Sequence, residues 1–219
     1  MTSLRRSGSA STISRLHSLR RRTMNHATNE RYGKMAQTFH WLTVLLVLAA
    51  FILGPKGSES RVYAPTGSFA PEGVFALEAS FQRQLHETLG LCVFALSLMR
   101  GLWLLVDKRP KPSPMARWMA IAGKSMQGLL YILLFAVPVT ALLGAWLEGH
   151  PVTLLAGLEF APALAKSAGL GQIIANLHTF LGDSILWLAG LHAMAALFHH
   201  FLLGDNVLLS MLPKWRSGA

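Results

Sequence analysis

The segment NLHTFLGDSILWLAGLHAMAALFHHF, residues 176–201, is long and apolar enough to cross a lipid bilayer as a single α-helix. It contains no lysine, arginine or glutamate, and Asp183 is its one acidic residue. It also contains four histidines, which are His178, His192, His199 and His200. Because polar side chains inside a membrane are costly and usually have a function, these imidazoles are the first candidates for a site.

The rest of the chain also has the composition of a membrane protein. Of its 219 residues 52% are hydrophobic and only 14% are charged, against about 25% charged in soluble domains. Three further segments are apolar over the length of a bilayer. The sequence therefore predicts an all-α, integral membrane four-helix bundle over residues 35–214. Its helices are expected at about 36–54, 86–106, 125–147 and 176–203, with a separate short helix near FALEASFQRQ before the second.

The distribution of positive charge predicts the orientation of the bundle. The net charge is +10, and most of the 20 lysines and arginines precede the first helix, lie between the second and third, or follow the fourth. By the positive-inside rule both termini and the middle loop are cytoplasmic, so the charge reflects topology and not nucleic-acid binding. Residues 1–34 are expected to form a basic, disordered extension and residues 215–219 a C-terminal tail.

Histidines of different helices fall at two matched depths. The predicted orientation puts His86 and His178 near the outer face, and we call these two the outer pair. His192 lies 14 residues after His178, about 21 Å deeper on the same helix face and level with His40. His40 and His192 are the inner pair. One imidazole from each of two helices is what a bis-histidine haem requires, so the sequence predicts two haems b stacked across the membrane.

Two glycines support the outer site. The hexapeptides LHETLG (85–90) and LHTFLG (177–182) place Gly90 and Gly182 four residues after a histidine. Each glycine lies one turn further along the same helix face, where a missing side chain leaves room for a flat macrocycle. The inner pair has Val44 and Ala196 at the matching positions.

Three other polar residues each have two interpretations. Arg100 lies 14 residues after His86, at the inner level, where it either pairs with a haem propionate or anchors its helix at the cytoplasmic face. Asp183 either orients a ligand or is a polar residue near a helix end. His199, beside His200 at the inner end of the fourth helix, either has a functional role or lies at the membrane interface. The sequence leaves these alternatives open.

Other kinds of cofactor fit the sequence less well. Cys92 is the only cysteine, and no C-x-x-C-H motif for covalent haem attachment occurs. HETLG (86–90) lacks the second histidine of the zinc motif H-E-x-x-H, and there is no glycine-rich phosphate loop. His150 lies in a polar loop and is expected at the surface. A histidine-lined metal or proton transporter remains an alternative, although the chain between the two histidine levels is almost entirely apolar.

Several segments together resemble the bacterial cytochrome b561 family of dihaem inner-membrane proteins, over roughly residues 30–214. They are QTFHWL, QLHETLG with LMRG, LLYILLFAVPVTALLG, HPVTLLAGLEFAP and HTFLGDSILWLAGLHAMAALFHHFLLGDNVLLSMLP. The resemblance implies that the inner pair binds one haem b and the outer pair the other. One type within the family oxidises superoxide at the periplasmic side and reduces ubiquinone, and His199 matches at the quinone end. Ser210 departs from the family, which usually has a basic residue there.

The resemblance implies a dihaem b-type cytochrome of the bacterial inner membrane that transfers electrons across it, to or from ubiquinone. An alternative is a haem-containing membrane anchor that relays electrons between quinone and a separate dehydrogenase or hydrogenase subunit. The expected partners are the lipid bilayer, quinone and a small-molecule or protein electron donor. The sequence leaves open the donor, the oxidoreductase activity itself and the oligomeric state, a homo-oligomer included.

Overall fold

The computed structural model of the chain describes residues 31–54, 74–106, 115–155 and 157–213. Four long helices make up most of them: α2 (Lys34–Leu53), α3 (Val74–Val106), α4 (Arg117–Glu148) and α5 (Ala168–Phe201). Each helix contains a segment long and apolar enough to cross a membrane, which in α3 is Phe81–Val106. The predicted four-helix membrane bundle is therefore confirmed. The expected tail, residues 215–219, and nearly all of the expected extension, residues 1–34, lie outside the described residues.

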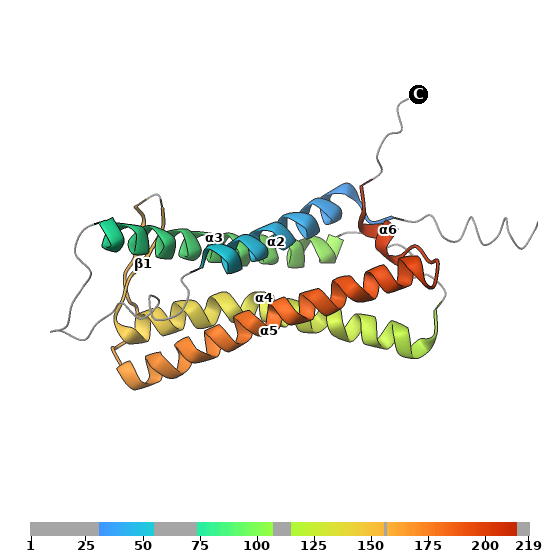
Figure 1. The fold of residues 1–219 in the computed structure, drawn as a ribbon. Coiled ribbons are helices and arrows are strands. Elements are labelled where there is room, and N and C mark those ends of the chain that lie inside the picture. The colour runs from blue at the N-terminus through green and yellow to red at the C-terminus, as the bar shows by residue number, and fades with distance from the viewer. Residues whose placement is uncertain (1–30, 55–73, 107–114, 156, 214–219) are drawn as a thin grey trace, which may run out of the picture.

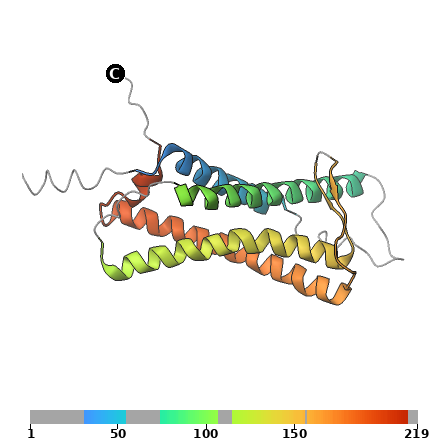
Figure 2. The same ribbon diagram turned by 180° about the vertical axis from the view of Figure 1, so that it is seen from behind.

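The helices form two layers, α2 beside α3 and α4 beside α5 (Figure 1). The most extensive helix packing is within these two pairs, and the same two layers are seen from behind in Figure 2. Gly171 brings the start of α5 against the end of α4, because a methyl group there would lie 2.9 Å from the backbone nitrogen of Glu148. Because the two helix pairs lie against each other as layers, residues of all four helices can face the interface between the layers.

A small apolar core lies midway along the bundle. Its buried members are Val93 of α3, Leu133 and Leu134 of α4, and Ile185 of α5, and Leu46 and Val47 of α2 pack against them. Ile185 is seven residues from both His178 and His192, about two helical turns in either direction. The core therefore separates the two predicted histidine levels.

Small elements close the two ends of the bundle. At one end strands β1 (Val152–Thr153) and β2 (Glu159–Phe160) form an antiparallel hairpin between α4 and α5. At the other end the short helix α6 (Val207–Met211) packs against the start of α2. There the indole nitrogen of Trp41 donates to the carbonyl oxygen of Met211 at 2.8 Å, and Nε2 of Gln37 donates to the carbonyl oxygen of Ser210 at 3.1 Å. Figure 2 shows the hairpin and α6 at opposite ends.

Three helices begin earlier than the sequence predicted. The segment FALEASFQRQ, expected as a separate short helix, is continuous with the second span, since α3 runs from Val74 to Val106. Helices α4 and α5 begin at Arg117 and Ala168 instead of about 125 and 176. The prediction followed the apolar segment, which measures how much of a helix lies in lipid. Backbone hydrogen bonds continue a helix beyond that segment, because they do not depend on apolar side chains.

Candidate functional site

The structure brings the outer pair together. His86 of α3 and His178 of α5 are both half-buried, and their ring centroids are 6.2 Å apart with the ring planes at 84°. A metal–nitrogen bond of about 2 Å on each side and ring radii of about 1 Å separate two imidazole centroids by about 6 Å when they share a metal ion. The spacing of the outer pair therefore fits one iron held between the two rings.

Both rings of the outer pair are oriented by backbone carbonyl oxygens of other helices. The Nδ1 atom of His86 lies 2.9 Å from the oxygen of Ala50, and the Nδ1 atom of His178 lies 2.9 Å from the oxygen of Val137. A carbonyl can only accept, so each Nδ1 carries the proton and donates it. The Nε2 atom of each ring is then the nitrogen left for a metal, as is usual for metal-bound histidine.

The two acceptors are available for local reasons. Ala50 belongs to the last turn of α2, where the final four carbonyl groups of a helix have no partner further along it. Val137 lies inside α4, where a carbonyl oxygen has two lone pairs and can accept a second hydrogen bond beside that of the helix. The oxygen of Val137 also accepts from the hydroxyl of Thr140 at 2.9 Å. The end of α2 thus supplies one of the two oxygens that hold the histidines, and a carbonyl inside α4 supplies the other.

The glycines near the outer pair have open space beside them. A Cβ atom added to Gly90 or to Gly182 would meet nothing within 4 Å. This space permits a flat group against the helices at these positions, and other glycines of the described helices, such as Gly101 and Gly169, have the same space. Three features of the described residues therefore suit a haem at this level. They are the spacing of the two imidazole rings, the orientation of those rings, and the open space beside Gly90 and Gly182.

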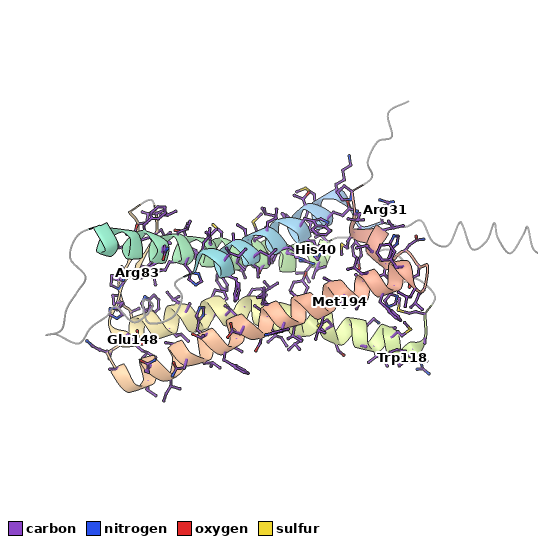
Figure 3. All side chains as sticks on the ribbon, in the orientation of Figure 1. Arg31, His40, Arg83, Trp118, Glu148 and Met194 are labelled. Carbon is purple, nitrogen blue, oxygen red and sulfur yellow. The ribbon has the colours of Figure 1, made fainter. Side chains whose placement is uncertain are left out.

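The inner pair is arranged differently. His40 of α2 and His192 of α5 are half-buried, and the two imidazoles interact electrostatically with each other. The Nδ1 atom of His40 is buried and has no hydrogen-bond partner among the described residues. Figure 3 places His40 toward the end of the bundle that holds Arg31 and Trp118, far from Arg83 and Glu148. The inner pair thus lies at a different level from the outer pair, and within the part of the chain that the structure describes its rings make no carbonyl contact like those of the outer pair.

Arg100 belongs to the inner site. Its charge acts on both His40 and His192, and its guanidinium carbon lies 5.2 Å from the centroid of the Tyr131 ring on α4. A cation in this place suits the carboxylate of a haem propionate, which is one of the two interpretations that the sequence allowed. Asp183, in contrast, is exposed on the surface of α5.

His199 has a partner that the sequence analysis missed. Its Nδ1 atom lies 2.5 Å from Oδ2 of Asp205, and Oδ1 of Asp205 accepts from the backbone nitrogen of Val207 at 3.0 Å. Gly204, whose φ of 64° favours glycine, makes the turn that brings Asp205 back to the end of α5. Six residues separate the two partners, which is outside the spacing of helical neighbours, so no helical pattern could reveal the pair.

The hairpin end carries a second group of polar contacts. The backbone nitrogen of Thr153 donates to the carboxylate of Glu87 at 2.6 Å, and that of Leu155 donates to the hydroxyl of Thr88 at 3.0 Å. Both acceptors directly follow His86 in the sequence. The hairpin is therefore tied to α3 beside the outer pair.

His150 lies next to these contacts and is less exposed than the sequence predicted. Its side chain keeps 20% of its surface exposed and lies 3.8 Å from the carboxylate of Glu148. Burial, and then the positive charges of Arg83 and Lys166, lower the pKa of His150 below its usual 6.5. The hairpin end thus carries charges of both signs close to the outer pair, the cations Arg83 and Lys166 and the carboxylates of Glu87 and Glu148.

Comparison with known proteins points to one family. The model of the family described as prokaryotic cytochrome b561 matches residues 31–214. Cytochrome b561 homolog 2 of Escherichia coli K12 is 31% identical over 191 residues, covering 85% of this chain and 94% of that protein. The probable superoxide oxidase CybB of Yersinia pestis is 29% identical over 86% of this chain and 99% of that protein. Cytochrome b562 of Cereibacter sphaeroides is 31% identical over 83% and 94%.

Proposed function

Because the chain belongs to the prokaryotic cytochrome b561 family, we propose that it transfers electrons across the bacterial inner membrane through two haems b, one at each histidine pair. It is a multi-pass inner-membrane protein and a b-type cytochrome that functions in electron transfer. The number of haems and the histidines that bind them are our proposal. The observation that supports this assignment most directly is at the outer pair. The ring centroids of His86 and His178 are 6.2 Å apart, and the Nδ1 atom of each ring is held by a carbonyl oxygen.

The roles of the residues follow from their positions. His86 and His178 would hold the outer haem, His40 and His192 the inner one, and Arg100 would bind a propionate of the inner haem. A haem iron with two imidazole ligands exchanges one electron at a time and has no free axial position for oxygen. The apolar core around Ile185 lies between the two sites. We infer from the charge distribution that the hairpin end faces the periplasm and the α6 end the cytoplasm.

We further propose that ubiquinone is reduced at the α6 end, beside His199. Reduction of a quinone to a quinol takes two electrons and two protons. Because Nδ1 of His199 is paired with Asp205, the ring orientation is set and Nε2 is the nitrogen left to serve a quinone oxygen. The two protons would enter from the aqueous side at the α6 end.

The electron donor that we propose at the hairpin end is superoxide. The positive charges of Arg83 and Lys166 act on this region and favour a small anion, although Glu87 and Glu148 lie there too. One relative bears the name probable superoxide oxidase, which supports the same donor. Two superoxide ions, each losing one electron to become dioxygen, would supply one quinone.

The first experiment is a reduced-minus-oxidised absorption spectrum of the purified protein, with haem quantified per chain. We expect b-type bands and two haems per chain, falling to one when either member of a pair is replaced by alanine. A protein without haem would contradict the proposal and revive the transporter alternative. Within the described residues, however, no three or more His, Cys, Asp or Glu side chains cluster to hold a metal ion.

The second experiment tests the substrates. Superoxide-driven reduction of a soluble ubiquinone analogue should fall at least tenfold in His199→Gln, while the neighbouring His200→Gln keeps the wild-type rate. Equal rates in both variants would remove His199 from the quinone site. Co-purification of a soluble dehydrogenase subunit, with no superoxide-dependent reaction, would favour the membrane-anchor alternative instead.

A further inference from the structure

Gly54 follows the last residue of α2 and has no conformational need to be glycine. Its φ of −67° and ψ of 153° are in the extended region that every residue adopts. Pro55 comes next in the sequence and itself favours an extended residue before it. Alanine readily adopts these φ and ψ angles and would lower the entropy of the unfolded chain. The reason for glycine must therefore lie in what surrounds it.

The surroundings of Gly54 are the two partners of the hydrogen bond that orients His86. A Cβ atom on this residue would lie 2.8 Å from Nδ1 of His86, 3.1 Å from its Cε1 atom and 2.8 Å from the oxygen of Ala50. These distances are well inside the normal separation of carbon and nitrogen or oxygen atoms in contact. A methyl group would thus push apart the two atoms that now stand 2.9 Å from each other.

We propose that Gly54 is a positioning residue for the outer haem: its missing side chain lets the His86 ring reach the carbonyl of Ala50. This inference rests on the proposed function, since it takes the outer pair as haem ligands. The carbonyl fixes the tautomer and the rotation of the ring, and the N–H···O=C bond makes Nε2 a more basic ligand. A more basic ligand stabilises ferric over ferrous iron, so Gly54 also holds the potential of the outer haem low.

Gly54 differs in this respect from Gly90 and Gly182. Those two have open space beside them, where a flat group can lie, whereas Gly54 contacts the ligand itself. The chain also offers a matched control in Gly169, which is in the first turn of α5, exposed and likewise without a neighbour within 4 Å of its Cβ position. Gly169→Ala therefore adds the same single methyl group as Gly54→Ala, but at a position where the methyl group lies near no histidine.

The test compares Gly54→Ala with Gly169→Ala in the purified holoprotein. For Gly54→Ala we expect haem per chain to fall from two toward one, or the outer haem to remain with a raised midpoint potential. The inner haem should keep its potential, and Gly169→Ala should match the wild type in both respects. In the haem-free protein, labelled with ¹⁵N-histidine, the Nδ1 resonance of His86 should lose the shift of a hydrogen-bonded nitrogen. An unchanged outer haem and an unchanged resonance would overturn the proposal.

A double variant separates a clash with the ring from damage to the backbone. In a His86→Ala background the ring is gone and only the contact with the oxygen of Ala50 remains, so adding Gly54→Ala should leave the inner haem unchanged and lower the thermal stability less than it does in the wild type. An equal loss with and without the ring would mean that the methyl acts on the end of α2, which also overturns the inference. Absence of haem from the wild-type protein would contradict the proposed function alone, because the resonance of His86 still reports on Gly54.

Discussion

The two histidine pairs differ in what holds them. Each ring of the outer pair donates to a backbone carbonyl oxygen of another helix, whereas the Nδ1 atom of His40 has no partner within the described part of the chain. The inner pair instead lies close to the positive charge of Arg100. One site is therefore positioned by hydrogen bonds and the other is dominated by a charge.

This difference indicates a direction for electron flow. Hydrogen bonds from ligand nitrogens to carbonyl groups favour ferric iron, and a nearby positive charge favours ferrous iron. With a haem at each pair, as proposed, both effects would make the outer site the poorer electron acceptor and the inner site the better one. Electrons that enter beside the hairpin should therefore move downhill toward α6.

The largest expected effect concerns the order in which the sites bind haem. When haem is titrated into the haem-free protein, we expect the outer site to fill first. Two preset hydrogen bonds of about 1 kcal/mol each correspond to at least tenfold tighter binding. His178→Ala should abolish the tight phase, and His192→Ala should abolish the weak one. Two phases of equal affinity would mean that the carbonyl contacts do not organise the outer site.

The next effect concerns the charge at the inner site. Arg100→Gln should lower the midpoint potential of the inner haem by on the order of 59 mV, a tenfold change for one electron. Arg100→Lys keeps the charge and should retain most of the wild-type potential. The outer haem should not change in either variant. Redox titration followed in the haem absorption bands measures both, and a shift confined to the outer haem would reverse the assignment of Arg100.

The smallest effect is on the pH dependence of the hairpin end. The pKa of His150 is lowered in the folded protein, so the unfolded chain binds more protons once the pH falls below about 6.5. The stability that neutral His150 contributes is thus complete above that pH and is lost as the pH falls. We expect the melting temperature to fall by at most a few degrees between pH 7.5 and 5, and His150→Gln to reduce this dependence. A melting temperature that rises on acidification would contradict the stated pKa direction.

The sequence was sufficient for the fold class and for the separation of the histidines into two levels. Both follow from one-dimensional quantities, since the length of an apolar segment measures a bilayer crossing and the rise per residue converts spacing into depth. His178 and His192 could be placed 14 residues apart on one face without knowing any neighbour. The helix starts were less accurate, because a helix such as α4 continues beyond its apolar part.

Only the tertiary structure decided which atoms orient the rings. Ala50 and Val137 act through backbone oxygens, so their side chains leave no signal in the sequence. Gly54 resembles an ordinary residue after a helix until His86 is seen against it. Asp205 meets His199 through a turn and not through helical spacing. The sequence by itself determined the depth of each histidine, because depth adds up along a single helix. The surroundings of each ring depend on how different helices pack, which no single segment contains.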